Sequence, residues 1–246
     1  MEIESLTFKT EKEYKEFLDY LFSIRDIKYR DFNTKIIVPV DSEIIGIRTP
    51  ILRDIGKKIA KISAENFLNL FEKLFIKKKI KYHEEKVLYG FILGYSKIDF
   101  QERLKRIDFF INIIDNWAVC DIVDSSFKFI NKNKEDFYKY LNSKLSATNP
   151  WEQRFIFVML LAYYIEDKYL KDIFKICEKI KSDEYYVKMA KAWLLSICYV
   201  KFKNETYKFL EKTNLDAWTV NKSIQKVRES LRVTKEEKEK ILLLKR

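Results

Sequence analysis

Apolar residues recur at every third or fourth position along most of this 246-residue chain. Clear examples are Val220-Ile224-Val227-Leu231 and Tyr186-Met189-Trp193-Ile197. Such spacing is typical of amphipathic α-helices, which gather these side chains on one face. The pattern predicts helices over residues 10–23, 50–61, 64–78, 81–95, 99–114, 117–130, 133–144, 150–164, 167–180, 183–201, 204–212, 218–232 and 234–244.

Residues that commonly start helices support three of these assignments. In Thr49-Pro50 the threonine is a candidate N-cap, and the proline fits the first helical position. Asn149-Pro150-Trp151-Glu152 repeats that arrangement with Glu152 placed for a capping box, and Thr234 with Glu237 predicts another box. The chain has only 4 Gly and 3 Pro, too few turn residues for a β-rich fold, so we expect an all-α protein.

The connections between the predicted helices are short, which favours antiparallel helical pairs. Tryptophan-bearing helices begin near residues 117, 150 and 183, at regular intervals of 33. This interval suggests stacked pairs in a HEAT-like α-solenoid, with a compact helical bundle as the alternative because the residues themselves do not repeat. No linker or low-complexity segment interrupts the chain, so we expect a single helical-repeat domain over residues 1–246.

The formal net charge of +11 favours a polyanionic partner such as nucleic acid. The alternative is a general compositional bias toward lysine. From Lys201 to Arg246 there are 13 Lys and Arg against 7 Asp and Glu, so more than half of the excess lies in the last fifth of the chain. This distribution favours a basic patch over a uniform bias.

Several kinds of chemistry are excluded by the residues available. The only histidine, His83, lies at a predicted helix start, where we expect a surface or capping residue. The cysteines Cys120, Cys177 and Cys198 are widely spaced in apolar helical surroundings, so we expect reduced, buried thiols in a cytoplasmic protein, with no metal site and no cofactor. The sequence contains neither a phosphate-binding glycine loop nor a G-x-S-x-G nucleophile motif.

Nothing in the sequence indicates a membrane role. The longest apolar run, over residues 155–165, is too short to cross a bilayer and suits a buried helix. The first residues, MEIESLTFKTEKEY, are charged and lack the apolar region of a secretory signal.

The stretch NWAVCD (116–121) places a carboxylate four residues after an indole. Trp117 and Asp121 would therefore share one helix face. The plain interpretation is a core tryptophan beside a solvated acid. The functional interpretation is a pair that handles a cationic ligand, because indole faces attract cations by about 0.5–2 kcal/mol. Asp124 lies on the same predicted face and is a competing carboxylate.

This stretch belongs to an ordered series of four motifs, namely GIRTPILRDIGKKI (46–59), NWAVCD (116–121), NPWEQR (149–154) and KMAKAWLLS (188–196). The series, over about residues 40–232, resembles the AlkD family of DNA alkylation-repair glycosylases. The resemblance implies a HEAT-like repeat with a concave basic face that binds duplex DNA. It also implies release of positively charged N3- and N7-alkylpurines without a metal or other cofactor, and without flipping the base into a pocket.

The resemblance places four residues at the family's catalytic-cleft positions. By motif match these are Trp117, Asp121, Arg154 and Trp193. Asp121 would stabilise the oxocarbenium-like sugar, and the two indoles would cradle the cationic nucleotide. Arg154 would contact a phosphate, or else form a plain salt bridge. The other two tryptophans, Trp151 and Trp218, are assigned to the core.

Two further basic groups are candidates for phosphate contact. One lies at a predicted helix start and comprises Arg48, Thr49 and Arg53. The other flanks the apolar stripe near the end of the chain and comprises Lys222, Lys226, Arg228 and Arg232. The alternatives are a simple cap at Thr49 and a solvated helix face for the second group.

The leading hypothesis is a monomeric DNA glycosylase for alkylated purines. Two alternatives stay open: a non-catalytic binder of branched or distorted DNA, and a protein-binding helical scaffold. The stretch KIIVPVDSEII (35–45) offers no counterpart to the aromatic residue that the family places near the lesion.

Overall fold

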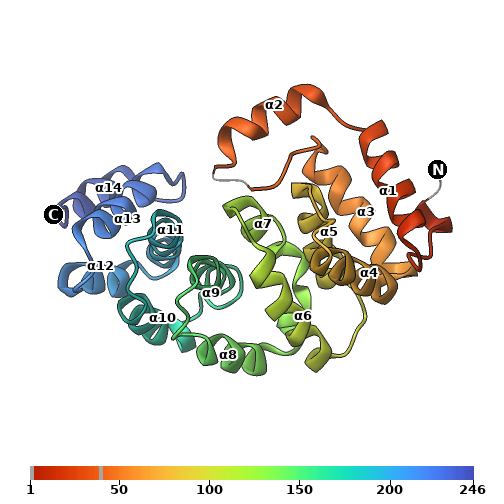
Figure 1. The fold of residues 1–246 in the computed structure, drawn as a ribbon. Helices are drawn as coiled ribbons and strands as arrows, with labels where there is room; N and C mark the ends of the chain where they lie inside the picture. Colours follow the sequence, from red (N-terminus) through yellow and green to blue (C-terminus); the bar gives the residue numbers. More distant parts are fainter. Residues whose placement is uncertain (1–2, 39–40) are drawn as a thin grey trace. The chain divides into compact units, whose positions relative to one another are not determined.

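The computed structural model describes residues 3–38 and 41–246, and these ranges consist of helices joined by short connections (Figure 1). Pro39 and Val40 of the stretch KIIVPVDSEII (35–45), which offers no counterpart to the family's aromatic residue, lie outside the described residues. In the described ranges the only β-type pairing is an isolated bridge between Glu43 and Tyr82. The all-α prediction is confirmed. The chain divides into two compact units, Met1–Asn133 (unit 1) and Lys134–Arg246 (unit 2).

Unit 1 is built around one helix, α5, whose residues from His83 to Gly94 are all buried. Helices α3, α4, α6 and α7 pack against it. A helix enclosed on all sides is apolar all round, as the middle and end of α5 are. The elements of unit 1 are η1 (Ile3–Ser5), α1 (Glu11–Ser23), α2 (Ile27–Ile36), α3 (Thr49–Ile62), α4 (Ala64–Ile76), α5 (His83–Tyr95), α6 (Phe100–Ile113), α7 (Trp117–Ile122), η2 (Asp124–Ser126) and η3 (Lys128–Lys132).

A glycine lets the segment after α7 approach α5 closely. A Cβ atom on Gly90 would lie 2.6 Å from Cγ1 of Val123 and 3.0 Å from the Phe110 ring. Real Cβ atoms are not found so close to another carbon, so a larger residue would push this segment away. Gly90 therefore helps to set the position of α7.

A buried carboxylate fixes the turn that leads into α3. Gly46 has a φ of 101°, a conformation that glycine adopts without the steric cost of a side chain. Glu84 accepts hydrogen bonds from the backbone N–H groups of Ile45, Gly46 and Ile47, at 2.9, 2.7 and 3.2 Å. The first turn of α5 thus holds the start of α3 in place.

Unit 2 consists of helices that alternate between two layers (Figure 1). Helix α11 packs against both α9 and α13 in one layer, and it also contacts α12 of the other layer. This arrangement agrees with the predicted helical pairs. The elements of unit 2 are α8 (Lys134–Ser143), α9 (Pro150–Tyr163), α10 (Asp167–Lys179), α11 (Tyr185–Lys201), α12 (Lys203–Lys212), α13 (Ala217–Glu229) and α14 (Lys235–Leu242).

Helix α2 is absent from the helices that the sequence pattern predicted. It buries only Asn33, while Ile27, Phe32 and Ile36 are 41%, 57% and 44% exposed, so it has no apolar stripe that periodicity can detect. Its start did carry a signal, because the Asp26 side chain accepts a hydrogen bond from the Tyr29 N–H at 3.0 Å.

The predicted helix over 117–130 is wrong beyond Ile122. After α7 the chain continues as two short 3-10 helices, η2 and η3. The Asp124 side chain accepts a hydrogen bond from the backbone N–H of Ser125, a local bond that competes with helix continuation.

The predicted helix starts are partly confirmed. Asn149 and Thr234 cap α9 and α14, and Thr234 forms its capping box with Glu237. At α3 the N-cap is Arg48, so Thr49 is the first helical residue rather than the cap. Glu152 forms no capping box, because its carboxylate pairs with Lys144 at 3.1 Å.

Two predictions about the chain's setting can be compared with the structure. All three cysteines are buried, as expected. None of the helices in the described ranges has the length and hydropathy that crossing a bilayer requires.

Candidate functional site

Helix α7 presents Trp117 and Asp121 at the surface of unit 1. Its start is fixed by Asn116, whose side-chain oxygen accepts hydrogen bonds from the N–H groups of Ala118 and Val119 at 3.0 and 3.1 Å. Ala118, Val119 and Cys120 are buried, whereas Trp117 and Asp121 are partly exposed. The short helix thus turns one apolar side inward and keeps the indole and the carboxylate within reach of solvent.

The indole of Trp117 forms one wall of a cavity of about 220 Å³. Its N–H donates a hydrogen bond to the backbone carbonyl of Ile36 at the end of α2, at 3.2 Å. Asp121 does not line this cavity, but the next residue, Ile122, does. The cavity is mostly apolar, and its other lining residues are Tyr29, Phe32, Asn33, Ile37, Ile47, Thr49, Leu52, His83, Glu84, Val87 and Ala118.

Tyr29 brings an aromatic ring to the same cavity from α2. Its hydroxyl lies 3.3 Å from Oγ1 of Thr49, and the Arg48 guanidinium lies 5.2 Å from its ring centroid. Arg48 also forms an ion pair with Asp26 at 2.7 Å. Two residues predicted to grip phosphate, Arg48 and Thr49, therefore hold Tyr29 in the structure, and their phosphate contacts stay a prediction.

Arg53 ties α3 to the segment that follows α7. Its guanidinium donates hydrogen bonds to the hydroxyls of Tyr95 and Ser125, at 3.1 and 2.8 Å, and to the carbonyl of Ile122 at 3.4 Å. It also lies 4.6 Å from the Phe91 ring centroid. These contacts position α7, and the phosphate contact of Arg53 stays a prediction.

Two carboxylates lie close together on this segment. Burial raises the pKa of Asp124, and the negative charge of Asp121 raises it further, while hydrogen bonds from Ser125 and the charge of Arg53 lower it. The carboxylates of Asp121 and Asp124 therefore repel each other, and the positive charge of Arg53 reduces the effect of this repulsion on Asp124.

A buried polar network lies beneath the start of α7. His83 is only 3% exposed, which corrects the expectation of a surface residue. Its Nδ1 lies 3.3 Å from the side-chain nitrogen of Asn116. The neighbouring Asp115 accepts hydrogen bonds from Lys86 and Ser42, both at 2.8 Å. The lone histidine thus supports the helix that carries Trp117.

Arg154 is the fifth residue of α9 in unit 2 and is 4% exposed. Its guanidinium donates a hydrogen bond to the backbone carbonyl of Tyr186 at 2.6 Å and lies 5.8 Å from the Tyr186 ring centroid. The predicted phosphate contact of Arg154 stays a prediction.

The tryptophans of unit 2 differ from one another in their surroundings. Trp193 lies in α11 and is partly exposed, seven residues after Tyr186 and so on the same helix face. Trp151 and Trp218, which we assigned to the core, are also partly exposed. Each lies at the start of a helix beside an aromatic ring of α11, so the core assignment is wrong.

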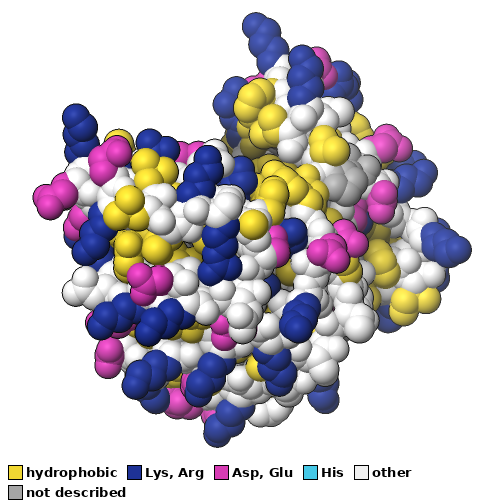
Figure 2. All heavy atoms as spheres, turned by 90° about the vertical axis from the view of Figure 1, so that its left-hand side faces the viewer, with side chains coloured by type: hydrophobic (Ala, Val, Ile, Leu, Met, Phe, Trp, Pro, Cys, Tyr) yellow, Lys and Arg dark blue, Asp and Glu magenta, His cyan; other side chains and the backbone are white. Residues whose placement is uncertain are grey.

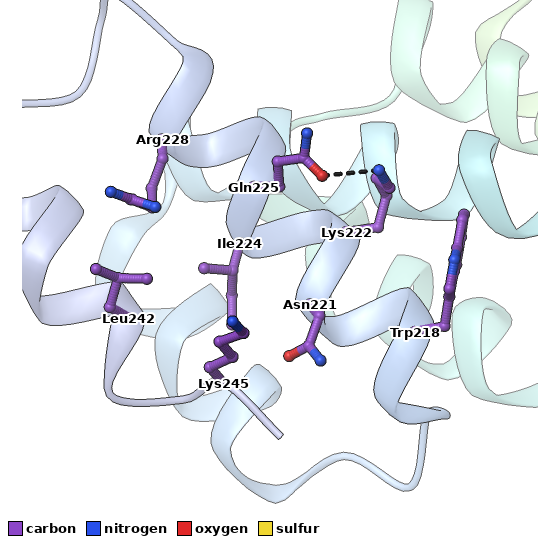
Figure 3. A pocket seen from close by; sticks show the side chains of 8 residues that line it. All are labelled: Trp218, Asn221, Lys222, Ile224, Gln225, Arg228, Leu242 and Lys245. Atoms are coloured by element: carbon purple, nitrogen blue, oxygen red, sulfur yellow. Dashed lines mark hydrogen bonds between the residues drawn. The ribbon is translucent and has the colours of Figure 1, made fainter.

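The predicted basic group near the end of the chain lies on and just after α13. Lys222 and Lys226 are partly exposed, and Arg228 and Arg232 are exposed. The face that carries the C-terminal helices shows lysine and arginine side chains interleaved with acidic and apolar ones (Figure 2). Lys222 and Arg228 line a cavity of about 380 Å³ between α13 and the end of α14 (Figure 3).

A family model described as "DNA alkylation repair enzyme" matches residues 15–227. The chain belongs to this DNA alkylation repair family. A search of curated proteins found no match. The family gives the protein a role in DNA alkylation repair, and DNA is the partner that this role implies.

For this DNA alkylation repair protein, the sequence motifs located α7 but missed the residues around it. The structure brings Trp117 and Thr49 to one cavity and adds Tyr29, Phe32 and His83. The Asp26 cap was the one local signal that could have revealed α2 and its tyrosine. In the described residues, no three His, Cys, Asp or Glu side chains lie close enough together to hold a metal ion.

Proposed function

We propose that the protein is a DNA glycosylase that hydrolyses the N-glycosidic bond of cationic N3- and N7-alkylpurines in duplex DNA. The observation that carries the proposal is the placement of Trp117 and Asp121 on one partly exposed side of α7, where Trp117 lines a cavity that Tyr29 also lines. Membership of the DNA alkylation repair family supports DNA as the substrate.

The substrate's own charge does much of the chemistry. Alkylation at N3 or N7 makes the purine cationic, so it leaves as a neutral base when the bond from C1′ to nitrogen breaks and the electron pair goes to the ring. No general acid is needed for that departure. Positive charge then develops on the sugar, and water adds at C1′ and releases a proton.

The carboxylate of Asp121 stabilises the developing positive charge on the sugar and orients the attacking water. Fixed charges of this kind are effective because they need no reorganisation as the transition state forms. In glycoside hydrolysis, carboxylates act in the same way on an oxocarbenium-like sugar.

Aromatic rings bind the cationic nucleotide before the bond breaks. The faces of Trp117 and Tyr29 each attract a cation, by about 0.5–2 kcal/mol per ring. In unit 2, the partly exposed Trp193 offers a further indole. The cations Arg48, Arg53, Arg154, Lys222, Lys226, Arg228 and Arg232, together with Thr49, contribute phosphate contacts in this proposal, with no metal and no cofactor.

The test is release of free methylpurine from N-methylated duplex DNA. The wild-type protein should release the base, and Asp121→Asn should lose most of that rate, by about 10²–10³-fold if its charge acts as a preorganised stabiliser. Asp124→Asn is the matched control, because it removes the neighbouring carboxylate and should retain most of the rate. Binding of methylated duplex without any base release by the wild-type protein would contradict the proposal and favour a non-catalytic DNA binder.

A further inference from the structure

Aromatic rings form a continuous row across the starts of three helices in unit 2. Trp151 of α9 lies 5.5 Å from Tyr186 of α11, which lies 5.1 Å from Tyr185, and Tyr185 lies 5.7 Å from Trp218 of α13, all between ring centroids. The last two contacts are edge-to-face, and Tyr185 remains 54% exposed. Tyrosine at such exposure offers ring surface to a ligand rather than to the core.

Cations accompany this aromatic row. The ammonium groups of Lys188 and Lys222 lie 5.2 and 5.6 Å from the Trp218 ring centroid. Lys188 also pairs with Asp216, the N-cap residue of α13, at 2.9 Å. Lys222 donates a hydrogen bond to Gln225 at 2.7 Å (Figure 3). Two ammonium groups, of which that of Lys188 is paired with Asp216, therefore lie beside the Trp218 ring.

The row leads into a cationic cavity of about 380 Å³ that Trp218 lines (Figure 3). Its volume falls within the range of about 300–1,000 Å³ that is usual for ligand clefts. Lys222, Arg228 and Lys245 line it, and none of its lining residues is acidic. The remaining lining residues are Asn221, Ile224, Gln225 and Leu242. A cavity with three cations and an indole suits a ligand that carries both phosphate and an aromatic base.

Three of the eight residues that line this cavity lie outside the part of the chain that matches the family. The match ends at residue 227, whereas Arg228, Leu242 and Lys245 follow it. The cavity is therefore completed by the segment that follows the match, and its ligand does not follow from family membership.

We propose that unit 2 carries a binding surface for an unpaired DNA strand, in which Tyr185 and Trp218 stack on bases while Lys222, Arg228 and Lys245 contact phosphates. The proposal extends the repair function proposed above and rests on it only in taking DNA as the partner. An unpaired strand fits better than a duplex, because duplex bases are stacked on one another and their faces are not available to protein rings. Aromatic platforms beside a cationic groove are the usual means of holding single strands.

The experiment measures fluorescence anisotropy of a labelled single-stranded thymidine oligonucleotide with the full-length protein. Tyr185→Ala should weaken binding by roughly 5- to 150-fold, the range that corresponds to loss of one stacking ring. Tyr185→Phe keeps the ring and should bind like the wild type. Tyr207→Ala is the matched control, because Tyr207 lies on α12, in the other layer of helices of the same unit, with Lys240 5.4 Å from its ring centroid.

A second measurement separates base stacking from charge alone. A strand of the same length without bases should bind the wild type more weakly than the thymidine strand, and Tyr185→Ala should remove that difference. Lys245→Gln should lower the slope of log affinity against log salt by about 0.7, the value for one phosphate contact on a single strand. Trp218→Phe keeps a ring at the end of the row that meets the cavity and guards against loss of folding, which circular dichroism checks for every variant.

Equal binding of the two strands by the wild type, or wild-type affinity in Tyr185→Ala, would overturn the inference. The glycosylase proposal fails on a different result, the absence of base release from methylated duplex. The two assays use different DNA and different variants, so the failure of one proposal is distinguishable from the failure of the other.

Discussion

Asn116 links the only histidine of the chain to the helix that carries Asp121. The oxygen of its side-chain amide accepts the N–H groups that start α7, which leaves its nitrogen facing Nδ1 of His83 at 3.3 Å. The same amide nitrogen donates to Asp115 at 2.8 Å, and it can donate to Nδ1 of His83 only where that ring nitrogen carries no proton.

Acid should therefore weaken the protein through His83. Burial lowers the pKa of His83, opposed by the charges of Glu84 and Asp115 and assisted by that of Lys86. Above the unfolded-state pKa of about 6.5, His83 is neutral in both the folded and the unfolded chain and does not reduce the free energy of unfolding. The free energy of unfolding declines as the pH falls from about 6.5 toward the lower folded-state pKa, because the unfolded chain takes up a proton that the buried ring does not.

Chemical unfolding of the wild type and of His83→Gln at pH 7.5 and at pH 5 measures this effect. The stability of the wild type relative to the variant should decrease at the lower pH. A difference between the two proteins that does not change with pH would assign the histidine a packing role only.

Breaking the buried ion pair between Lys86 and Asp115 should strongly destabilise the protein. The two side chains are only 10% and 9% exposed and lie 2.8 Å apart. Lys86→Met leaves a buried carboxylate without its cation, which should lower the free energy of unfolding by about 3–5 kcal/mol. Lys57→Met is the control, because Lys57 pairs with Asp54 at the surface and should cost less than about 1 kcal/mol. Equal losses in the two variants would show that burial does not distinguish the pairs.

The indole of Trp117 should contribute through both its face and its N–H group. Trp117→Phe keeps a ring but loses the hydrogen bond to the Ile36 carbonyl, so stability should fall by about 0.5–1.5 kcal/mol. Trp117→Leu also removes the aromatic face, so base release should fall further, by roughly 2- to 30-fold relative to Trp117→Phe. Equal rates of base release in the two variants would exclude a cation–π role for this residue.

Lys222 and Arg228 should contribute to duplex binding through charge alone. Each neutral substitution, Lys222→Gln or Arg228→Gln, should lower the slope of log affinity against log salt by about 0.9, the value for one phosphate contact on duplex DNA. Lys139→Gln serves as the control, because Lys139 is highly exposed on α8 and pairs with Asp136. An unchanged slope in either test variant would remove that residue from the phosphate contacts.

Helical periodicity was a good guide to elements that bury a stripe, and a poor guide to α2. Strongly patterned helices such as α10 and α13 lie where the apolar spacing predicted them. Helix α2 buries almost nothing, so its sequence carries no stripe to detect. The apolar pattern therefore could not predict that Tyr29 of α2 lines the Trp117 cavity. The four-residue spacing of Trp117 and Asp121, by contrast, predicts that they share a helix face.

The burial of His83 could not be predicted for a related reason. The run His83-Glu84-Glu85-Lys86 looks like a solvated helix start, yet all four side chains are buried. Their partners are distant in sequence: Glu85, for example, accepts a hydrogen bond from the Tyr14 hydroxyl at 2.7 Å. Only the tertiary fold supplies the groups that make such burial tolerable.

The carboxylate of Glu84 occupies a position that resembles an anion nest, with three successive backbone N–H groups pointing at its oxygens. In phosphate-binding proteins, the backbone N–H groups of a loop of this kind bind the phosphate. Here the chain has supplied its own anion, so those three amides are already engaged. Under the proposed function, a DNA backbone at this turn contacts the guanidinium of Arg48 and the hydroxyl of Thr49 rather than these three amides.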